Sequence, residues 1–501
     1  MDGHEIVEVN LSAVERTKRI DAEFYKKENI AVDSILSSWN KKSIADCFSV
    51  SDGNHMSITD SFCEIGIPYY RGQDIYNLFI ENASPLMIDR TTFDKPQMRR
   101  SHLKKGDIIM SIVGAIVGNS AMVTSSKPAT CSCKLAIMRS KNNGISPELL
   151  LVYIKTKYGQ VQIQKFKRGA AQTGLLLEDF DQLFIPVFGE KFQKSISQLV
   201  HQVYECTQQA VLAYENAQSH LNNTIGLDSV LPDNTISEKT FSSSFKKTGR
   251  LDAEYYQPKF DILFDKLSKL SNKRLGGDDG IANIKKSIEP GSDSYKDEGI
   301  PFVRVSDVSK YEITSPEIYL SHDVVENVAA LFPKKDTILF SKDGSVGIAY
   351  KLERNEDIIT SGALLHLTVK NTSEVLPDYL TLVLNSLVVQ MQAERDSNGA
   401  IIQHWKPSEI ENVIIPILDM AKQKELAEMI QKSFALRRQS KQLLEYAKQA
   451  VQMAIEQGED TALASKKKLI CGQSFVQLWR SIVIKISLSM RLNLCMTFMM
   501  P

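Results

Sequence analysis

The chain has 501 residues, of which 43% are hydrophobic and 24% are charged, enough to bury cores in several domains. Its 60 basic residues equal its 60 acidic residues, which excludes attraction of a polyanion by net charge; a nucleic acid would be met by local basic clusters. The 7 cysteines show no paired C-x-x-C spacing, which argues against a disulfide framework. Because no secretory signal is visible, we expect a cytoplasmic protein.

The first half is expected to contain a β-rich domain followed by helices. Short apolar runs such as Ile108–Met110, punctuated by Gly, Pro, Asn and Asp, indicate strands and turns. Ser146-Pro147-Glu148 is typical of a helix start, and apolar residues follow at helical spacing from Leu149 to Phe166.

A long helix is predicted next, because residues 190–222 contain no Gly or Pro. Apolar and small residues step by alternating fours and threes through this segment, as in a heptad seam. The seam residues are Phe192, Ile196, Leu199, Val203, Cys206, Ala210, Ala213 and Ala217. The spacing fits a helix that pairs with another helix, and it fits an ordinary core helix equally well.

The second half repeats this order. A helix start recurs at Leu376-Pro377-Asp378, and a second seam follows, with Ser433, Arg437 and Ser440 interrupting its middle, where polar residues could fix helix register. The apolar seam positions are Leu426, Ile430, Leu444, Ala447, Val451 and Ala454. The expected division is a lead-in over 1–40, a β-rich domain over 41–145, a helical region over 146–225, a linker and start of the second repeat over 226–263, a β-rich domain over 264–372, a helical region over 373–457 and an atypical tail over 458–501.

The two halves are copies of one another. Arg19-Ile-Asp-Ala-Glu-Phe-Tyr25 returns as Arg250-Leu-Asp-Ala-Glu-Tyr-Tyr256, about 230 residues later, too long a period for a solenoid unit. Further landmarks recur in the same order and at a similar offset: Gly66–Arg71 with Gly299–Arg304, Ser111–Gly114 with Ser341–Gly344, and Gly169-Ala170 with Gly399-Ala400. We expect Arg19 with Asp21, and Arg250 with Asp252, to hold the start of each half without touching a ligand.

No catalytic motif is visible in the sequence. It has no G-x-x-x-x-G-K-[ST] phosphate loop, no G-x-G-x-x-G fingerprint, no H-E-x-x-H and no G-x-S-x-G. Of the 8 histidines only His366 sits in an apolar run, where a hydrogen-bonded core histidine is expected. We therefore expect no catalytic residue, no metal and no cofactor, with a nuclease site built from separated acids as the open alternative.

The doubled motif order resembles the specificity (S) subunit of type I restriction-modification enzymes over residues 19 to 457. The resemblance rests on Arg-x-Asp-Ala-Glu-x-Tyr, on Gly-Ile-Pro-x-x-Arg-x-x-Asp (66–74 and 299–307), on Lys-Lys-x-x-Ile-x-x-Ser-x-x-Gly (104–114 and 334–344), and on an Ile-Pro strand before a long helix. One departure is the loop Gly114–Gly118, which is one residue longer than Gly344–Gly347.

The resemblance implies an α+β fold with a pseudo-twofold internal repeat. In it, two β-rich target recognition domains alternate with long conserved helices that form an antiparallel coiled-coil spacer. It further implies a non-catalytic subunit for phage defence that binds double-stranded DNA at a bipartite site. Its protein partners would be adenine-N6 methyltransferase (M) subunits and, through them, a restriction (R) subunit, with no membrane.

Candidate DNA-binding residues follow from the chemistry of DNA. Phosphates attract Lys and Arg, while base edges are read by Arg or Lys on guanine and by Asn or Gln on adenine. The candidates are Arg71, Gln73, Arg99, Arg100, Lys104, Lys105, Lys167 and Arg168 in the first half, and Lys285, Lys286, Arg304, Lys334, Lys335, Lys342, Gln403 and His404 in the second.

Two other interpretations stay open. Arg71 and Arg304 could pair with Asp74 and Asp307 to hold a turn rather than touch DNA. The whole chain could be a duplicated scaffold whose β-rich units bind a protein or a glycan, which its balanced charge permits.

Overall fold

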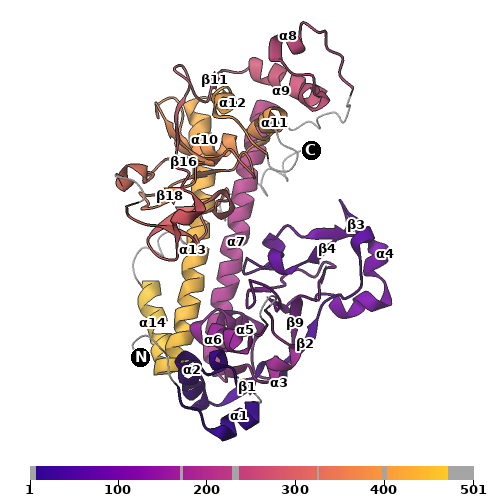
Figure 1. The fold of residues 1–501 in the computed structure, drawn as a ribbon, viewed down its shortest axis with the longest axis vertical. Helices are drawn as coiled ribbons and strands as arrows, with labels where there is room; N and C mark the ends of the chain where they lie inside the picture. The colour runs from indigo at the N-terminus through magenta and orange to yellow at the C-terminus, as the bar shows by residue number, and fades with distance from the viewer. Residues whose placement is uncertain are drawn as a thin grey trace, which may run out of the picture. The chain divides into compact units, whose positions relative to one another are not determined.

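A computed structural model describes residues 7–17, 19–169, 173–227, 236–323, 327–397 and 403–471. The chain divides into two compact units (Figure 1). Unit 1 comprises residues 1–205 and 439–501, and unit 2 comprises residues 206–438. Each unit therefore contains one β-rich half of the repeat and one part of each of the two longest helices.

Unit 1 starts with helices and continues into strands. Its elements are α1 (Leu11–Thr17), α2 (Lys27–Ser37), β1 (Lys41–Ser43), α3 (Ile44–Cys47), β2 (Phe48–Asp52), β3 (Phe62–Cys63), β4 (Ile67–Tyr70), β5 (Leu86–Ile88), α4 (Arg90–Phe93), β6 (Ile108–Ser111), β7 (Ser120–Met122), β8 (Thr130–Cys131), β9 (Leu135–Ser140), α5 (Pro147–Ile154), α6 (Lys157–Phe166), β10 (Phe184–Pro186), the start of α7 (Glu190–Ile225), the end of α13 (Met420–Gln457) and α14 (Glu459–Cys471).

Unit 2 repeats the order of the strands and of the main helices. They are α8 (Phe245–Thr248), α9 (Pro258–Ser268), β11 (Asn272–Arg274), β12 (Ala282–Lys286), β13 (Tyr295–Lys296), β14 (Ile300–Val303), β15 (Tyr319–Leu320), β16 (Ile338–Ser341), β17 (Ala349–Lys351), β18 (Ile359–Thr360), β19 (Leu364–Val369), α10 (Pro377–Leu384), α11 (Leu387–Asp396), α12 (Pro407–Glu411) and β20 (Ile414–Pro416), together with the remaining parts of α7 and α13.

The sheets are duplicated strand for strand. Unit 1 has four-stranded sheets in the orders β2-β9-β6-β7 and β3-β5-β4-β8, and unit 2 has β12-β19-β16-β17 and β13-β15-β14-β18. A two-stranded antiparallel sheet closes each unit, with Lys41 opposite Pro186 in β1–β10 and Asn272 opposite Pro416 in β11–β20. The predicted α+β fold with an internal repeat is confirmed, and β1 and β11 tie the start of each β-rich half to the strand before its long helix.

The predicted helix from Leu149 to Phe166 is two helices. Ser146 caps α5 as expected, but the chain breaks after Ile154, and the Thr156 hydroxyl accepts from the Gly159 amide to start α6. A Cβ on Gly159 would lie 2.4 Å from the Tyr153 carbonyl oxygen, so only glycine permits this close approach. Helical spacing alone cannot reveal such a break, because both helices bury apolar residues up to and beyond it.

The duplicated Arg-x-Asp-Ala-Glu-x-Tyr motif folds identically in both units. Arg19 makes a two-pronged ion pair with Asp21 at 2.6 and 2.8 Å, and the hydrogen bond to Arg19 lowers the pKa of Asp21. Arg250 pairs with Asp252 at 2.8 and 2.5 Å. In each copy the tyrosine hydroxyl donates 3.1 Å to the arginine carbonyl oxygen. The ion pair and the tyrosine hydrogen bond thus tie the motif to itself in both copies, which supports the structural role expected for it.

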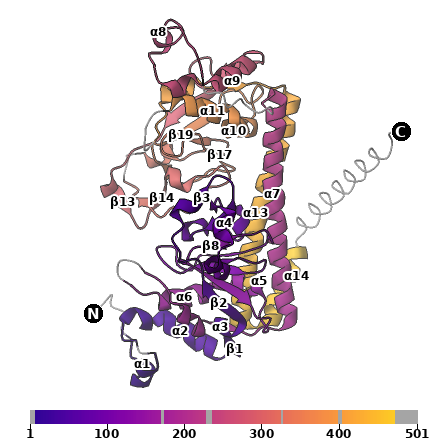
Figure 2. The ribbon, with the colours of Figure 1, turned by 90° about the vertical axis from the view of Figure 1, so that its right-hand side faces the viewer.

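The two long helices pair antiparallel within each unit (Figures 1 and 2). In unit 2, His220 of α7 lies 3.7 Å from Glu425 of α13, and the Ser433 hydroxyl donates to the Ala210 carbonyl oxygen. In unit 1, Ser440 of α13 donates to the Val203 carbonyl oxygen at 3.4 Å. Residue numbers fall along α7 as they rise along α13, so the two helices are antiparallel.

The predicted seams are buried with two local differences. Phe192, Ile196, Ala210 and Ala217 of α7 are all at most 1% exposed. Ala213 and Leu444, however, are only half-buried, while their neighbours are buried instead: Tyr214 (1% exposed) and Leu443 (9% exposed). A straight helix has 3.6 residues per turn rather than 3.5, so the buried stripe drifts by a residue along its length.

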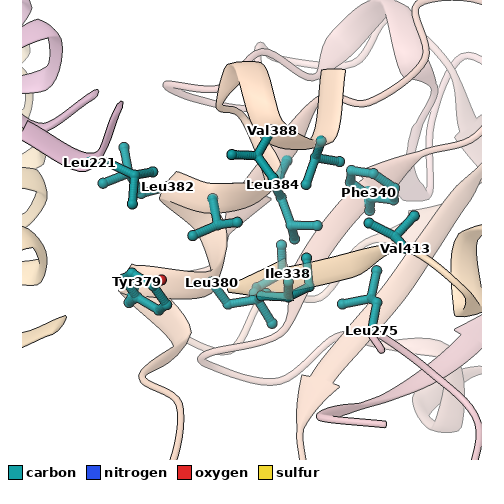
Figure 3. Packing of buried hydrophobic residues seen from close by; sticks show 14 of the residues in the cluster. Leu221, Leu275, Ile338, Phe340, Tyr379, Leu380, Leu382, Leu384, Val388 and Val413 are labelled. Atoms are coloured by element: carbon teal, nitrogen blue, oxygen red, sulfur yellow. The ribbon is translucent and has the colours of Figure 1, made fainter. Parts of the chain in front are cut away.

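The core of unit 2 joins its β-rich half to the long helices. Leu221 of α7, Tyr379 of α10 and Phe340 of β16 belong to one continuous buried cluster, shown in Figure 3. Side chains from the sheet, from the helices after it and from the long helices therefore pack as one core. The burial of these apolar side chains stabilises the packing of the second β-rich half against its helices.

The atypical tail is ordered at its start. Glu459, the first residue of α14, accepts the Gly189 amide at 3.0 Å, just before α7 begins in the same unit. Ala462 is 1% exposed. The start of α14 thus extends the packed part of unit 1, which the sequence did not indicate. Among the described residues, none of the helices is long and apolar enough to cross a membrane.

Candidate nucleic-acid interface

Two arginines stand at the end of equivalent strands, β4 and β14. The Arg71 guanidinium pairs with Asp74 by hydrogen bonds of 3.2 Å from both Nε and Nη2. Arg304 is held more loosely, because its Nε lies 3.7 Å from Asp307 and has no hydrogen-bond partner. The turn-holding role left open by the sequence is therefore the observed state of Arg71, whereas Arg304 keeps donors to spare.

Three segments that are distant in the sequence meet beside Arg304 in unit 2. The loop after β16 is joined to one neighbour by the Lys342 amide, which donates 2.9 Å to the Ala363 carbonyl. Just before this turn, the Ser361 amide donates 2.9 Å to the carbonyl of Val303, the residue before Arg304. On the other side, the Gly344 amide donates to the Gln403 carbonyl. The fold thus brings Arg304, Lys342 and Gln403 into one surface, which we call the second loop junction.

The second loop junction carries a charged triad. The Asp343 carboxylate is paired with both Lys342 and His404, and His404 Nδ1 lies 2.9 Å from Asp343 Oδ1. The His404 side chain is 62% exposed, so its other ring nitrogen faces solvent. The next residue, Trp405, is buried against Phe340 with ring centroids 5.9 Å apart and anchors the segment. A fixed, exposed ring nitrogen is suited to donate to or accept from a ligand.

Unit 1 builds the same junction from different side chains; we call it the first loop junction. The Gly114 amide donates 2.8 Å to the Thr173 carbonyl, and the Leu175 amide donates 2.9 Å to the Ile112 carbonyl. Where unit 2 has Asp343 opposite His404, unit 1 has Val113 opposite Gly174. The same backbone therefore presents a charged surface in one half and an apolar one in the other.

Arg168 borders the first loop junction but is committed to a partner. Its guanidinium pairs with Asp179, which is 1% exposed and whose pKa burial raises. Lys167 beside it is half-buried. The equivalent glycine-alanine landmarks cannot be compared further, because Ala170, Gly399 and Ala400 lie outside the described residues.

The extra residue in the loop Gly114–Gly118 does not change how that loop closes. Both loops begin and end at glycines with positive φ, at 98° and 96° in unit 1 and at 72° and 85° in unit 2. The Gly118 amide donates 2.9 Å to Ser111, and the Gly347 amide donates 2.9 Å to Ser341. The insertion is absorbed between fixed ends.

A second kind of candidate precedes strands β6 and β16. Lys104, Lys105, Lys334 and Lys335 are exposed, and no ion pair is recorded for any of them in the described part of the chain. The Lys104 amide donates 2.8 Å to Asp107, a buried carboxylate that also pairs with Arg139. The buried carboxylate fixes the turn, while the lysine side chains are exposed to solvent, as phosphate contacts require.

The remaining candidates are dispersed. Arg99 and Arg100 follow one another in the turn Pro96–Ser101; both are exposed, and Arg100 pairs with Asp52. Gln73 is exposed next to Arg71, and Lys285 and Lys286 are exposed on the edge strand β12. Among the described residues, no hydrogen bond or ion pair links these groups to either loop junction.

Sequence reasoning missed two residues at the junctions. Asp343 positions His404, and Lys134 is exposed beside the first junction, where its carbonyl accepts the Ile112 amide. Their signal was the repeat itself, since both adjoin landmarks that recur in the two halves. In the part of the chain that the structure describes, no group of His, Cys, Asp and Glu side chains could hold a metal ion.

A comparison with protein families finds one match. Residues 278–446 match the model of the type I restriction modification DNA specificity domain. This segment contains most of the second β-rich half, the second loop junction and most of α13. A search of curated protein sequences finds no match.

Solved structures with a similar chain course include two specificity subunits. The type I restriction-modification S subunit from M. genitalium is 14% identical, with a TM-score of 0.35, covering 85% of this chain and 95% of that one. The HsdS subunit from Thermoanaerobacter tengcongensis is 16% identical, with a TM-score of 0.29, covering 84% and 97%. The type IIG restriction endonuclease BpuSI is 10% identical over 38% of this chain and 30% of its own, with a TM-score of 0.29.

Proposed function

We propose that the two halves of this chain, which belongs to the family of type I restriction-modification DNA specificity subunits, each read one half of a bipartite DNA sequence. The observation that supports the proposal most is the pair of loop junctions. The same backbone presents Asp343 and His404 in unit 2 but Val113 and Gly174 in unit 1. Different side chains on equivalent surfaces favour half-sites of different sequence.

We assign the side chains two tasks. Arg304, Gln403 and His404 would read base edges, because they lie at one junction, Gln403 and His404 are exposed, and the Arg304 side chain is 40% exposed. The exposed lysines at 104, 105, 334 and 335 would bind phosphates, which supply affinity without sequence information. Arg71 and Arg168 would support the junction, because each is already paired with a carboxylate.

The chain is the DNA-recognition subunit and not the catalytic one. In this family, methylation and cleavage belong to partner subunits, the adenine-N6 methyltransferase and the restriction subunit. The methyltransferase subunit brings its own S-adenosylmethionine. We propose that this protein works in the cytoplasm, where bacterial DNA and those partners are found. The alternative of a protein-binding or glycan-binding scaffold is not favoured by the family match.

The proposal is tested with the purified complex of this chain and its methyltransferase subunits. Selection of the bound molecules from a random DNA library should enrich one split sequence with two different halves and a fixed spacing. The Arg304→Ala variant should relax only one half. Enrichment of an unsplit sequence, or of none, would overturn the proposal.

A further inference from the structure

A cationic side chain is stacked on an aromatic ring where the second β-rich half meets the long helices. The Arg437 guanidinium of α13 lies 3.6 Å from the centre of the Tyr311 ring. Tyr311 in turn meets Tyr214 of α7 edge-on, with ring centroids 5.1 Å apart. Lys310 Nζ lies 5.1 Å from the centres of both tyrosine rings. Side chains from both long helices therefore grip one loop of unit 2.

This arrangement is costly by itself. Arg437 Nε and Nη2 are buried and have no hydrogen-bond partner, and burial lowers the pKa of the guanidinium. A buried charge without full hydrogen bonding destabilises a fold unless another interaction offsets it. The Tyr311 ring supplies that interaction, because the face of an aromatic ring attracts a cation, and more strongly where water is excluded. The neighbouring Glu312 carboxylate adds a further attraction to the guanidinium.

The gripped loop is directly connected to the proposed reading arginine. Arg304 begins the turn Val305–Asp307, and the next turn is closed by the Ser309 amide donating 2.9 Å to the Glu312 carbonyl, with Tyr311 at its tip. The Thr314 amide then returns to the Asp307 carbonyl at 2.8 Å. The hydrogen-bonded segment from Arg304 to Thr314 therefore transmits the position of Tyr311 to Arg304.

Among the described residues of unit 1, no cation–ring contact joins the β-rich half to the long helices. Gln193 and Gln423 occupy equivalent places, since their side chains accept the Ser146 and Leu376 amides at 3.0 Å. Counting along each helix from these glutamines puts Thr207 where α13 has Arg437. The aromatic contact between the β-rich half and α7 in unit 1 is the edge-on pair Phe79–Tyr204, at 5.0 Å. The contact of Arg437 with the Tyr311 ring, which we call the cation clamp, is therefore found in unit 2 and has no equivalent among the described residues of unit 1.

We propose that Arg437 is a positioning residue that fixes the second DNA-reading domain on the helix pair and so sets where the second half-site must lie. This rests on the proposed function, and it adds an asymmetry: the second domain is held by a cation–ring contact and the first by apolar packing. Loss of the clamp leaves the base-reading side chains intact but allows the second β-rich half to move relative to the long helices. Binding must then immobilise the domain, which costs affinity and weakens the preference for one spacing.

The test uses the complete complex with the methyltransferase subunits. Arg437→Met keeps the length of the side chain and removes its charge. It should weaken binding to the full bipartite DNA by about 3- to 30-fold and broaden the tolerated spacing by a base pair or more, with both half-site sequences unchanged. Lys432→Met is the matched control, because it makes the same kind of change at an exposed lysine of α13 in the same unit; it should change neither readout.

A second pair of variants covers the case in which Arg437→Met fails to fold. Tyr311→Phe keeps the ring and should behave like the wild type, whereas Tyr311→Leu should reproduce the broadened spacing. Unchanged spacing in folded Arg437→Met and Tyr311→Leu complexes would overturn the clamp while leaving the proposed function intact. Absence of any sequence preference in the wild-type complex would instead overturn the proposed function itself.

Discussion

Ser433 and Ala210 are joined across the helix pair by a hydrogen bond of 2.6 Å from the serine hydroxyl to the alanine carbonyl oxygen. Ser433 is fully buried, and Ser440 makes the corresponding contact to Val203. In both bonds a serine of α13 donates to a backbone carbonyl of α7. Because each is a polar contact inside an apolar seam, it favours one register of the two helices over its neighbours.

Replacing Ser433 by Ala should lower the free energy of unfolding by about 1 kcal/mol, the net value of one buried hydrogen bond. The change removes a hydroxyl and leaves the Ala210 carbonyl its partner within the helix. Urea unfolding of the purified protein measures it. Ser219→Ala, at an exposed position of α7, is the control and should be neutral. An equal effect of both changes would remove any special role from the seam serine.

Arg71 and Arg304 should respond differently to alanine. Arg304→Ala should cost about 1–3 kcal/mol of discrimination at one base pair of the second half-site, with little loss of stability. Arg71→Ala should destabilise unit 1, because it removes both hydrogen bonds to Asp74, which is 6% exposed. Competition binding with single-base variants of the target, beside thermal unfolding, separates the two. A loss of discrimination from Arg71→Ala at unchanged stability would refute this division.

The lysines before β16 should act on affinity alone. Lys335→Ala should weaken binding to all sequences alike and reduce the slope of log K against log salt by about 1, because one phosphate contact is lost. Titrations at several salt concentrations give the slope. Lys105→Ala, at the equivalent turn of unit 1, should behave in the same way, and Lys448→Ala on the far part of α13, paired with Glu445, should not. A sequence-dependent loss would mean that the lysine contacts a base.

His366 should make unit 2 less stable in acid. It lies in the central strand β19, where burial lowers its pKa to about 4, and its Nε2 is 2.8 Å from the Thr360 hydroxyl. The unfolded residue titrates near ~6.5, so the unfolded chain takes up a proton that the folded chain refuses as the pH falls from ~6.5 to ~4. The free energy of unfolding must fall through that window.

The contribution of His366 is isolated by comparison with His366→Gln, which cannot titrate. Urea unfolding at pH 7 and pH 5 should show a larger loss of stability for the wild type than for the variant. All other groups titrate in both proteins and cancel. Identical losses would mean that His366 is protonated without penalty.

Much of the fold could be predicted because the sequence contains two copies of the same motif order. The repeated motif, the helix starts at Ser146 and Leu376 and the seams were each recognisable from residue type and spacing. The break after Ile154 was not, because it depends on a contact between Gly159 and the preceding helix. Hydrophobic spacing reports which side is buried and not where a helix stops.

The candidate site was recognisable only in part. Basic residues could be picked from the sequence, but their partners could not: Asp179 holds Arg168, and Asp52 holds Arg100. Asp52 lies on strand β2, far from Arg100 in the sequence, and Asp179 lies in a short helix after the loop that follows Arg168, so only the fold reveals which cations remain available. The Arg437–Tyr311 stack was hidden for the same reason, since the sequence marked Arg437 only as an interruption of the seam.

The most direct test of the central claim is methylation mapping in cells that carry this chain with its methyltransferase subunit, before and after residues 264–372 are exchanged for the corresponding domain of another specificity subunit. The account predicts methylated adenines in a split sequence whose two halves differ, and an exchange that alters one half while the other half stays the same. Methylation of an unsplit sequence, or an exchange that alters both halves together, would contradict it.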